Sequence, residues 1–294
     1  MTRSRATAIG FSAILLWSLL ALLTVGTAPV PPFLLNALTF AVGGAVGVAW
    51  VVLAGDRRVL GRISWKVYAF GTIALFGYHF LYFSAMRMAP AAEAGLIAYL
   101  WPLLIVIFSG LLPGERLTRG HVLGAGIAFA GAALIVLRPG AGLSGEAMPG
   151  YLLAFLCALT WAGYSVLSRR LGAVPTESVA VFCLATAALS MLAHLALEQP
   201  AWPASATGWG AVLALGLGPV GLAFYVWDVG MKKGDIQLLG VASYAAPLLS
   251  TTALVLAGYA AATPRLAIAA AMIAFGAALA AWASVRRAGR KLQA

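Results

Sequence analysis

The chain has 294 residues, of which 63% are hydrophobic and only 9% carry a charge, and its mean hydropathy is +0.97. Average soluble domains are closer to ~45–50% apolar and ~25% charged, so this composition excludes an ordinary soluble enzyme, a disordered protein and a fibrous protein. The net charge of +11 does not indicate a nucleic-acid partner, because the basic residues interrupt long apolar runs and form no continuous stripe. The excess of apolar surface predicts a protein that has lipid as its solvent.

Ten apolar runs are long enough to cross a bilayer as helices, which requires ~20 mostly apolar residues each. The connectors are too short to hold a soluble domain, so the predicted fold class is an all-α polytopic membrane protein with ten transmembrane helices. The first run also has the form of a signal peptide, but its length and the internal repeat described below favour a retained span. In chain order, spans 1 to 10 cover about residues 7–25, 33–54, 67–88, 91–112, 120–138, 150–170, 176–197, 208–231, 236–257 and 265–284.

Lysine and arginine are distributed unequally between the connectors. If the N-terminus is cytoplasmic, sixteen of these residues fall on the inner side and three (Arg87, Arg138 and Arg265) fall on the outer side. Loops that remain in the cytoplasm carry an excess of positive charge. The distribution therefore predicts that both termini are cytoplasmic, and it supports the number of spans.

The second half of the chain repeats the first at an offset of 144 or 145 residues. The boundaries predicted from this repeat are residues 1–145 for spans 1–5 and residues 146–294 for spans 6–10. Five is an odd number, so the second half must enter the membrane from the opposite side. Inverted repeats of this kind indicate secondary transporters, with a substrate site near the bilayer midplane. The matched pairs include Trp17 with Trp161, Tyr99 with Tyr244, and Pro102 with Pro247.

Aromatic residues gather half-way along the spans, at Trp17, Tyr78, Trp101 and Trp161. This depth is unusual, because tryptophan and tyrosine prefer the headgroup region. Packing between helices is one interpretation. The other is a central cavity with aromatic walls, which suits a ligand that has a flat apolar group.

Proline lies at mid-span in the fourth span of each half, at Pro102 and Pro247. Each proline removes one helical hydrogen bond. In lipid this is tolerated where the backbone finds another partner or lines a wet cavity. We therefore predict kinks or hinges at the cavity wall, with a simple packing kink as the alternative.

Charged and titratable residues within spans are candidates for function. Asp228 and Lys232 are four residues apart near the cytoplasmic end of span 8, and we expect a pair that extends toward the interface. Glu93 and Arg87 lie close together near the outer face, as an interfacial pair or a gate. His79 is the titratable group nearest the midplane, and it is either a proton-coupling group or a hydrogen-bonded packing residue.

The full pattern resembles the drug/metabolite transporter (DMT) superfamily, in its EamA family. The likeness rests on ten spans in two halves, a tryptophan in the first span of each half (Trp17 and Trp161), the mid-span prolines, and Glu115 just after span 4. The chain departs from the pattern at Ala260, which stands opposite Glu115, and in span 2, where Asn36 and Thr39 occupy a region in which many members have an arginine.

This resemblance implies export of small metabolites across a bacterial inner (plasma) membrane by alternating access, with no cofactor. The aromatic residues of spans 3 and 4 favour aromatic or large neutral amino acids as the substrate. The expected partners are this small molecule and the lipid bilayer, with no nucleic acid, and the sequence leaves the oligomeric state open, although a monomer accommodates every feature above. The predicted substrate-binding residues are Trp17, Asn36, Tyr78, His79, Tyr82, Tyr99, Trp101, Trp161, Ser243 and Tyr244; the predicted hinges are Pro102 and Pro247; and the predicted gate or coupling residues are His79, Arg87 and Glu93.

Three alternatives to amino-acid export follow from the same residues. A multidrug or lipophilic-cation exporter would use the aromatic faces together with an acid such as Glu93. A passive channel would need a polar pore lining, which these apolar helices do not supply. An intramembrane enzyme would need a nucleophile with a base or a set of metal ligands, and the three histidines and two cysteines form no such motif and no metal site.

Overall fold

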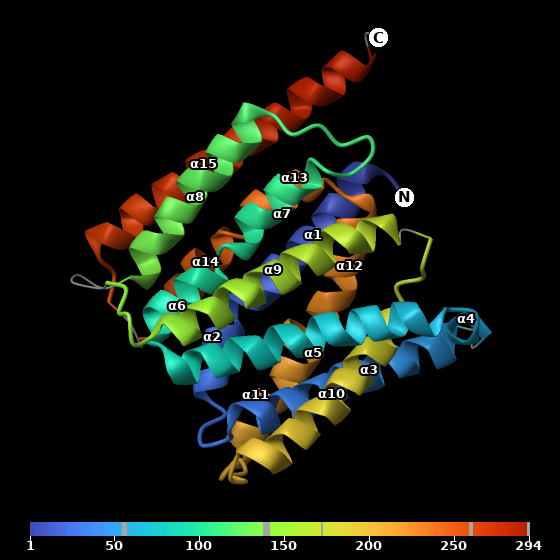
Figure 1. The fold of residues 1–294 in the computed structure, drawn as a ribbon, viewed down its shortest axis with the longest axis vertical. Helices are drawn as coiled ribbons and strands as arrows, with labels where there is room; N and C mark the ends of the chain where they lie inside the picture. The colour runs from blue at the N-terminus through green and yellow to red at the C-terminus, as the bar shows by residue number, and fades with distance from the viewer. Residues whose placement is uncertain (55–57, 138–141, 172, 259–260, 293–294) are drawn as a thin grey trace.

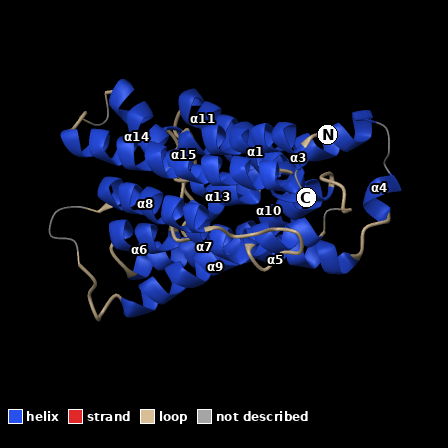
Figure 2. Cartoon of the chain, turned by 90° about the horizontal axis from the view of Figure 1, so that it is seen from above, coloured by secondary structure: helices blue, strands red, loops and turns tan. Residues whose placement is uncertain are grey.

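A computed structural model describes residues 1–54, 58–137, 142–171, 173–258 and 261–292. Over these ranges the chain is helical and contains no strand (Figure 2). The helices are α1 (Arg3–Ser18), α2 (Leu20–Val25), α3 (Pro32–Ala54), α4 (Arg58–Gly61), α5 (Trp65–Met88), α6 (Ala91–Ala98), α7 (Trp101–Ser109), α8 (Arg119–Val136), α9 (Met148–Arg170), α10 (Ser178–Leu197), α11 (Ala206–Leu217), the π-helix η1 (Gly218–Leu222), α12 (Ala223–Lys233), α13 (Ile236–Ala242), α14 (Ala245–Leu256) and α15 (Pro264–Leu292).

Ten segments within the described ranges are long and apolar enough to cross a membrane, which confirms the predicted number of spans. Six of them (spans 2, 3, 5, 6, 7 and 10) are the single helices α3, α5, α8, α9, α10 and α15. The other four are interrupted. Span 1 is α1 with α2, span 4 is α6 with α7, span 8 is α11 with η1 and α12, and span 9 is α13 with α14.

The principal helix contacts join the first five spans to the last five. Helix α8 packs along α15, α3 along α10, α5 along α9, α1 along α12, and α7 against α13 (Figure 1). This set of pairs is unchanged when each span is replaced by the span five places along the chain. An approximate two-fold relation between the halves requires such a set, while the inverted insertion of the second half stays a prediction.

Small residues allow the closest of these contacts. A Cβ atom on Gly124 of α8 would meet the carbonyl oxygen of Gly276 on α15, and a Cβ on Gly276 would meet the carbonyl oxygen of Gly124. Glycine is required here because two backbones approach directly, as at the small-residue interfaces of membrane helices. The remainder of this interface contains buried alanines on both helices, so the glycine-rich and alanine-rich faces of spans 5 and 10 are covered by each other.

The main hydrophobic core lies among α1, α5, α7, α9 and α12, and it contains the large aromatic residues Trp101, Trp161, Phe224 and Trp227. Both termini lie at one end of the bundle (Figure 2). We call this end the terminus face; it also carries residues 113–118 and 234–235, and the opposite end, which carries residues 26–31 and 198–205, is called the cavity face.

Candidate functional site

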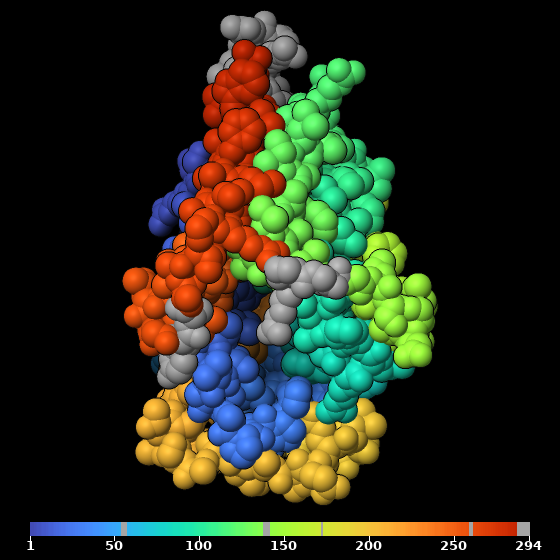
Figure 3. Space-filling view, turned by 90° about the vertical axis from the view of Figure 1, so that its left-hand side faces the viewer, coloured from blue at the N-terminus to red at the C-terminus, as the bar shows by residue number. Residues whose placement is uncertain are grey.

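A cavity of about 820 Å³ enters the bundle from the cavity face. Its wall is built from spans 1, 2, 3, 4, 6, 8 and 9, and its rim includes residues 27–30 between α2 and α3. Figure 3 looks onto this face, where a hollow lies between the blue residues at the start of α3, the teal end of α5 and the orange α14. The volume is typical of a small-molecule site, which is usually a concave pocket of ~300–1,000 Å³.

Tryptophan and phenylalanine rings form the bottom of the cavity, which we call the aromatic floor (Trp17, Trp101, Trp161 and Phe224). The Trp17 ring lies edge-on to Trp101 and to Trp161, with ring centroids 6.1 Å apart in both cases. Beneath it, Trp227 is 1% exposed and approaches Trp17 to 5.0 Å between centroids. Edge-to-face pairs contribute ~0.5–1.5 kcal/mol each beyond their area burial, so the floor is both apolar and stiff.

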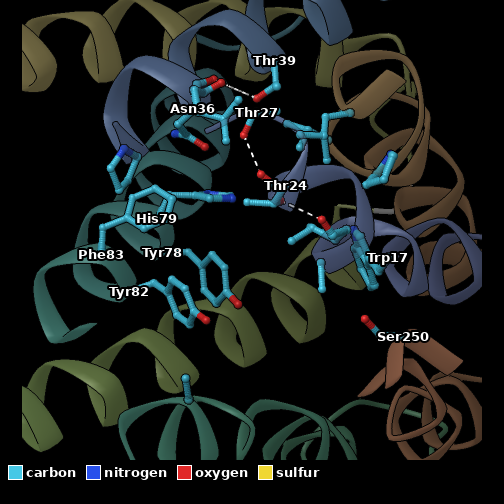
Figure 4. A pocket seen from close by; sticks show the side chains of 18 of the residues that line it. Trp17, Thr24, Thr27, Asn36, Thr39, Tyr78, His79, Tyr82, Phe83 and Ser250 are labelled. Atoms are coloured by element: carbon cyan, nitrogen blue, oxygen red, sulfur yellow. Dashed lines mark hydrogen bonds between the residues drawn. The ribbon is translucent and has the colours of Figure 1, made fainter. Parts of the chain in front are cut away.

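One side wall consists of aromatic residues that also carry polar atoms. Tyr78, His79 and Tyr82 follow one another on a single face of α5, and Tyr99 comes from the break between α6 and α7. The Tyr78 ring lies 5.4 Å from the Trp161 ring, so this wall is continuous with the aromatic floor. Figure 4 shows Tyr78 and Tyr82 on the same side of the pocket.

The opposite wall carries small polar side chains, namely Thr24, Thr27, Asn36 and Thr39 (Figure 4). The Nδ2 atom of Asn36 donates to Ser190 Oγ of α10 at 2.7 Å, which fixes the amide. Among the described residues that line the cavity there is no aspartate, glutamate, lysine or arginine. The site therefore combines a large apolar contact area with neutral hydrogen-bonding groups.

Both predicted hinge prolines lie next to a break in a span. Helix α6 ends at Ala98 and α7 begins at Trp101, one residue before Pro102. In span 9, α13 ends at Ala242 and α14 begins two residues before Pro247. The structure thus has interruptions at equivalent places in the two halves, whereas a hinge motion at these prolines stays a prediction.

Span 8 contains a further irregularity that the sequence analysis did not anticipate. The π-helix η1 (Gly218–Leu222) interrupts it, and its Pro219 and Val220 line the cavity. A π-helix inserts one extra residue per turn and so rotates the following helix, a feature that occurs often at functional sites. This rotation brings Phe224 onto the aromatic floor, while the equivalent helix α5 is continuous.

The terminus face is closed by two kinds of contact. Helices α1 and α12 approach so closely that a Cβ atom on Gly10 would lie 2.8 Å from the Cα atom of Gly230. Around this contact, Glu115 forms ion pairs with Arg169 at 2.8 Å and with Arg3 at 3.3 Å, and Arg3 also approaches Asp235 at 3.3 Å. The Glu115–Arg169 and Arg3–Asp235 pairs each join the two halves of the chain.

The Asp228–Lys232 pair is present, with 2.8 Å between Oδ2 and Nζ, but it does not extend to the interface as expected. Its two side chains are only 2% and 3% exposed. The linker after α9 covers them, because Thr176 Oγ1 donates to Asp228 Oδ2 at 2.7 Å and Lys232 Nζ donates to the Val174 carbonyl at 2.9 Å. The sequence spacing indicated the pair correctly but could not show what packs over it.

The expected pair between Arg87 and Glu93 is not formed, and this prediction was wrong about the partner. Arg87 binds Glu198 at 2.7 Å, and Glu93 has no ion pair among the described residues and does not line the cavity. The Glu198 carboxylate also accepts the N–H groups of Phe33 and Leu34 at the start of α3, and it lies 3.0 Å from His194 Nδ1. A carboxylate is favourable at a helix N-terminus, which accounts for the place of Glu198 beside α3, and there it is within reach of Arg87.

Most of the predicted substrate-binding residues lie together. The eight that line the cavity are Trp17, Asn36, Tyr78, His79, Tyr82, Tyr99, Trp101 and Trp161. Ser243 and Tyr244 are fully buried outside it. Ser243 Oγ donates to the Leu239 carbonyl, and the Tyr244 hydroxyl accepts the Leu103 N–H at 3.1 Å, which supports the broken region of span 4. Counting along a span gives the depth of a residue but not its rotation about the helix axis.

The sequence analysis missed several lining residues, although helical spacing could have found some of them. Thr24 lies seven residues after Trp17 and shares its helix face, and Phe83 lies four residues after His79. Thr27 and Ser250 had no comparable signal, because a loop and a kinked helix position them. Phe224 depends on the register that η1 sets.

Comparisons with known proteins agree with this architecture. The model of the EamA-like transporter family matches residues 5–137 and again residues 148–282, so that each match falls within one predicted half. The aromatic amino acid exporter YddG of Ancylobacter novellus is 58% identical over 282 residues, covering 95% of this chain and 98% of that protein. The aromatic amino acid exporter YddG of Salmonella typhimurium is 31% identical, covering 85% and 88%.

A solved crystal structure is similar along almost the whole chain. It has 58% sequence identity and a TM-score of 0.91, and the match covers 95% of this chain and 98% of that one.

Proposed function

Since the chain belongs to the EamA-like transporter family, we propose that it is a secondary transporter that exports aromatic and other large neutral amino acids. One observation carries the proposal: the cavity combines an aromatic floor with neutral polar walls and, among its described lining residues, has no charged side chain. Such a site accommodates an aromatic side chain together with an amino and a carboxyl group whose charges cancel. The similarity to two aromatic amino acid exporters supports the same substrate class.

The charge distribution supports an orientation for the cavity in the membrane. Sixteen of the nineteen lysines and arginines fall on the side of the termini, so we assign the terminus face to the cytoplasm of a bacterial cell. The cavity then opens to the outside of the inner membrane, in the state that releases an exported substrate.

Alternating access requires the closed and open faces to exchange. In the opposite state the contact between Gly10 and Gly230 and the ion pairs of Glu115 and Arg3 separate, and the cavity face closes. The breaks beside Pro102 and Pro247 supply points at which spans 4 and 9 bend. An inverted repeat makes the two states similar in energy, because each half takes over the arrangement of the other.

The alternative of a lipophilic-cation exporter would need an acid at the cavity. Glu93 was the candidate, and it lies outside the lining. The neutral lining therefore favours amino acids over cations.

The test is transport by the purified protein in proteoliposomes. We expect vesicles preloaded with unlabelled phenylalanine to accumulate labelled phenylalanine by exchange, faster than protein-free vesicles and in competition with tryptophan and tyrosine. Trp101→Ala should weaken the apparent affinity for phenylalanine by about 10-fold, because it removes an aromatic contact from the floor. Equal uptake with and without protein contradicts the proposed function, and unchanged exchange by Trp101→Ala removes this residue from the site.

A further inference from the structure

The polar groups of the cavity differ in the direction of their hydrogen bonds. The hydroxyl groups of Thr24, Thr27 and Thr39 already donate their protons to main-chain carbonyls, those of Leu20, Thr24 and Leu35 respectively, at 2.7–2.8 Å. A hydroxyl has a single proton, so once that proton is donated to a carbonyl, the hydroxyl oxygen has only lone pairs to offer to a ligand. These three side chains can therefore accept a hydrogen bond from a ligand but cannot donate one while the main-chain bonds persist.

Asn36 and His79 have the same polarity. One N–H of Asn36 Nδ2 donates to Ser190 Oγ, and Oδ1, which accepts no hydrogen bond from the described residues, remains as an acceptor for a ligand. His79 Nδ1 lies 2.7 Å from the Leu75 carbonyl oxygen. A carbonyl can only accept, so Nδ1 carries the proton and Nε2 of the neutral ring is an acceptor. We call Thr24, Thr27, Asn36, Thr39 and His79 the acceptor group.

The tyrosines of the facing wall have the opposite character. Among the described residues, none provides a hydrogen-bond partner for the hydroxyl groups of Tyr78, Tyr82 and Tyr99, and all three line the cavity. Each can donate its proton to a ligand. We call these three residues the donor group. In Figure 4, Tyr78 and Tyr82 lie across the pocket from Thr24, Thr27, Asn36 and Thr39.

We infer that the cavity orients an amino acid by these two groups, with the ammonium at the acceptor group, the carboxylate at the donor group and the side chain on the aromatic floor. This inference rests on the proposed function and specifies how its substrate is held. An ammonium has three donors and no acceptor, whereas a carboxylate has only acceptors, so each charged end of the ligand matches one of the two groups and is mismatched with the other. The reverse orientation would place a carboxylate against lone pairs and leave buried charges without partners.

The free amino group is therefore the specificity-determining feature on the polar side of the substrate. Acylation of the nitrogen removes its charge and two of its three donors, so N-acetylphenylalanine should bind at least about 10-fold more weakly than phenylalanine. Ser250 on α14 also lines the cavity, but its hydroxyl has no hydrogen-bond partner among the described residues, so it can donate to one end of the ligand or accept from the other.

The test pairs three ligands with two near-isosteric variants. The ligands are phenylalanine, phenethylamine, which lacks the carboxylate, and 3-phenylpropanoate, which lacks the amine. Thr39→Val removes an acceptor and Tyr82→Phe removes a donor, with little change of shape in either case. Binding of each ligand to the full-length protein in nanodiscs is measured by calorimetry, and the folding of each variant is checked by its melting temperature.

We expect a crossed pattern. Thr39→Val should weaken the binding of phenylalanine and of phenethylamine by about 5- to 10-fold and change the affinity for 3-phenylpropanoate by less than about 2-fold. Tyr82→Phe should weaken the binding of phenylalanine and of 3-phenylpropanoate and leave the affinity for phenethylamine unchanged. Asn36→Asp, which adds a negative charge to the acceptor group, should raise the affinity for phenethylamine and lower the affinity for 3-phenylpropanoate. It serves as a gain-of-binding test that a misfolded variant cannot mimic.

The possible failures are distinct. If the wild-type protein binds all three ligands but the pattern is reversed, or both variants affect every ligand equally, the orientation is wrong while amino-acid binding stands. If the wild-type protein binds neither phenylalanine nor its two analogues, the proposed function and the orientation are both overturned.

Discussion

The two faces of the bundle are built differently. On the cavity face, the Arg87–Glu198 pair lies beside the cavity and holds the start of α3, and no described charged residue lines the opening. On the terminus face, α1 and α12 meet at two glycines, and Glu115, Arg169, Arg3 and Asp235 surround this contact. The terminus face is thus closed by direct backbone contact together with ion pairs between the halves, whereas on the cavity face the Arg87–Glu198 pair also joins the halves but lies beside an opening.

This difference shows where the free energy that selects the present state resides. Contacts that join the two halves on the terminus face must be exchanged during transport, so each of them biases the equilibrium between states. Contacts within one half contribute to stability in every state. The variants below separate these two roles, from the largest expected effect to the smallest.

Asp228→Leu should have the largest effect on stability. It leaves the Lys232 ammonium buried without its anion, and removal of one partner from a buried pair lowers the free energy of unfolding by ~3–5 kcal/mol. The melting temperature in detergent measures this loss. The double variant Asp228→Leu/Lys232→Met, which removes both charges, should recover most of it, and an equally unstable double variant would show that the pair is not the cause.

Gly10→Val should combine a loss of stability with a loss of transport. The valine side chain cannot fit against Gly230, so the closed terminus face is destabilised by ~1–3 kcal/mol, which shifts the equilibrium between the two states by about 5- to 150-fold. Exchange of labelled phenylalanine and the melting temperature report on both. Gly126→Val is the matched control, because a Cβ atom at Gly126 of α8 meets nothing within 4 Å. Equal losses in both variants would argue against a specific role for the contact between α1 and α12.

Glu198→Gln should have an intermediate effect on stability. It weakens the N-terminal cap of α3 and the interactions with Arg87 and His194, and we expect a loss of ~1–2 kcal/mol, reduced because the Arg87 side chain is 43% exposed. The control is Glu93→Gln, which should change stability by less than ~0.5 kcal/mol. A larger effect of Glu93→Gln, in melting temperature or in exchange, would support the gate role that the sequence predicts for Glu93.

Arg3→Gln should have the smallest effect. The Arg3 side chain is 39% exposed, and ion pairs at such sites contribute no more than ~1 kcal/mol and are screened by salt. We expect the melting temperatures of the wild-type protein and this variant to converge as sodium chloride is raised from low to molar concentration. A difference that persists at high salt would indicate a role for Arg3 beyond these pairs.

The two halves of the repeat also show why equivalent residues need not share a role. Tyr99 and Tyr244 match at an offset of 145 residues and both lie at a break in a span. Tyr99 lines the cavity, whereas Tyr244 is fully buried and accepts a hydrogen bond from Leu103. Because the cavity opens on one face of the bundle, the two repeat-related tyrosines have different surroundings. The sequence analysis placed both tyrosines in the substrate site, but only Tyr99 lines the cavity.

Composition and apolar periodicity determined the class of the protein, the number of spans and the approximate depth of the tryptophans and prolines, because burial in lipid imposes a strict length and polarity on each helix. Family membership also followed from the sequence, through its repeated tryptophans and prolines. The tertiary structure decided which face each helix turns inward. Phe224 reaches the floor after the π-helix η1, Ser243 is buried at the break in span 9, and the packing of α10 against α3 and α5 gives Arg87 its partner in Glu198. These outcomes depend on contacts between segments far apart in the chain, and local sequence carries little information about such contacts.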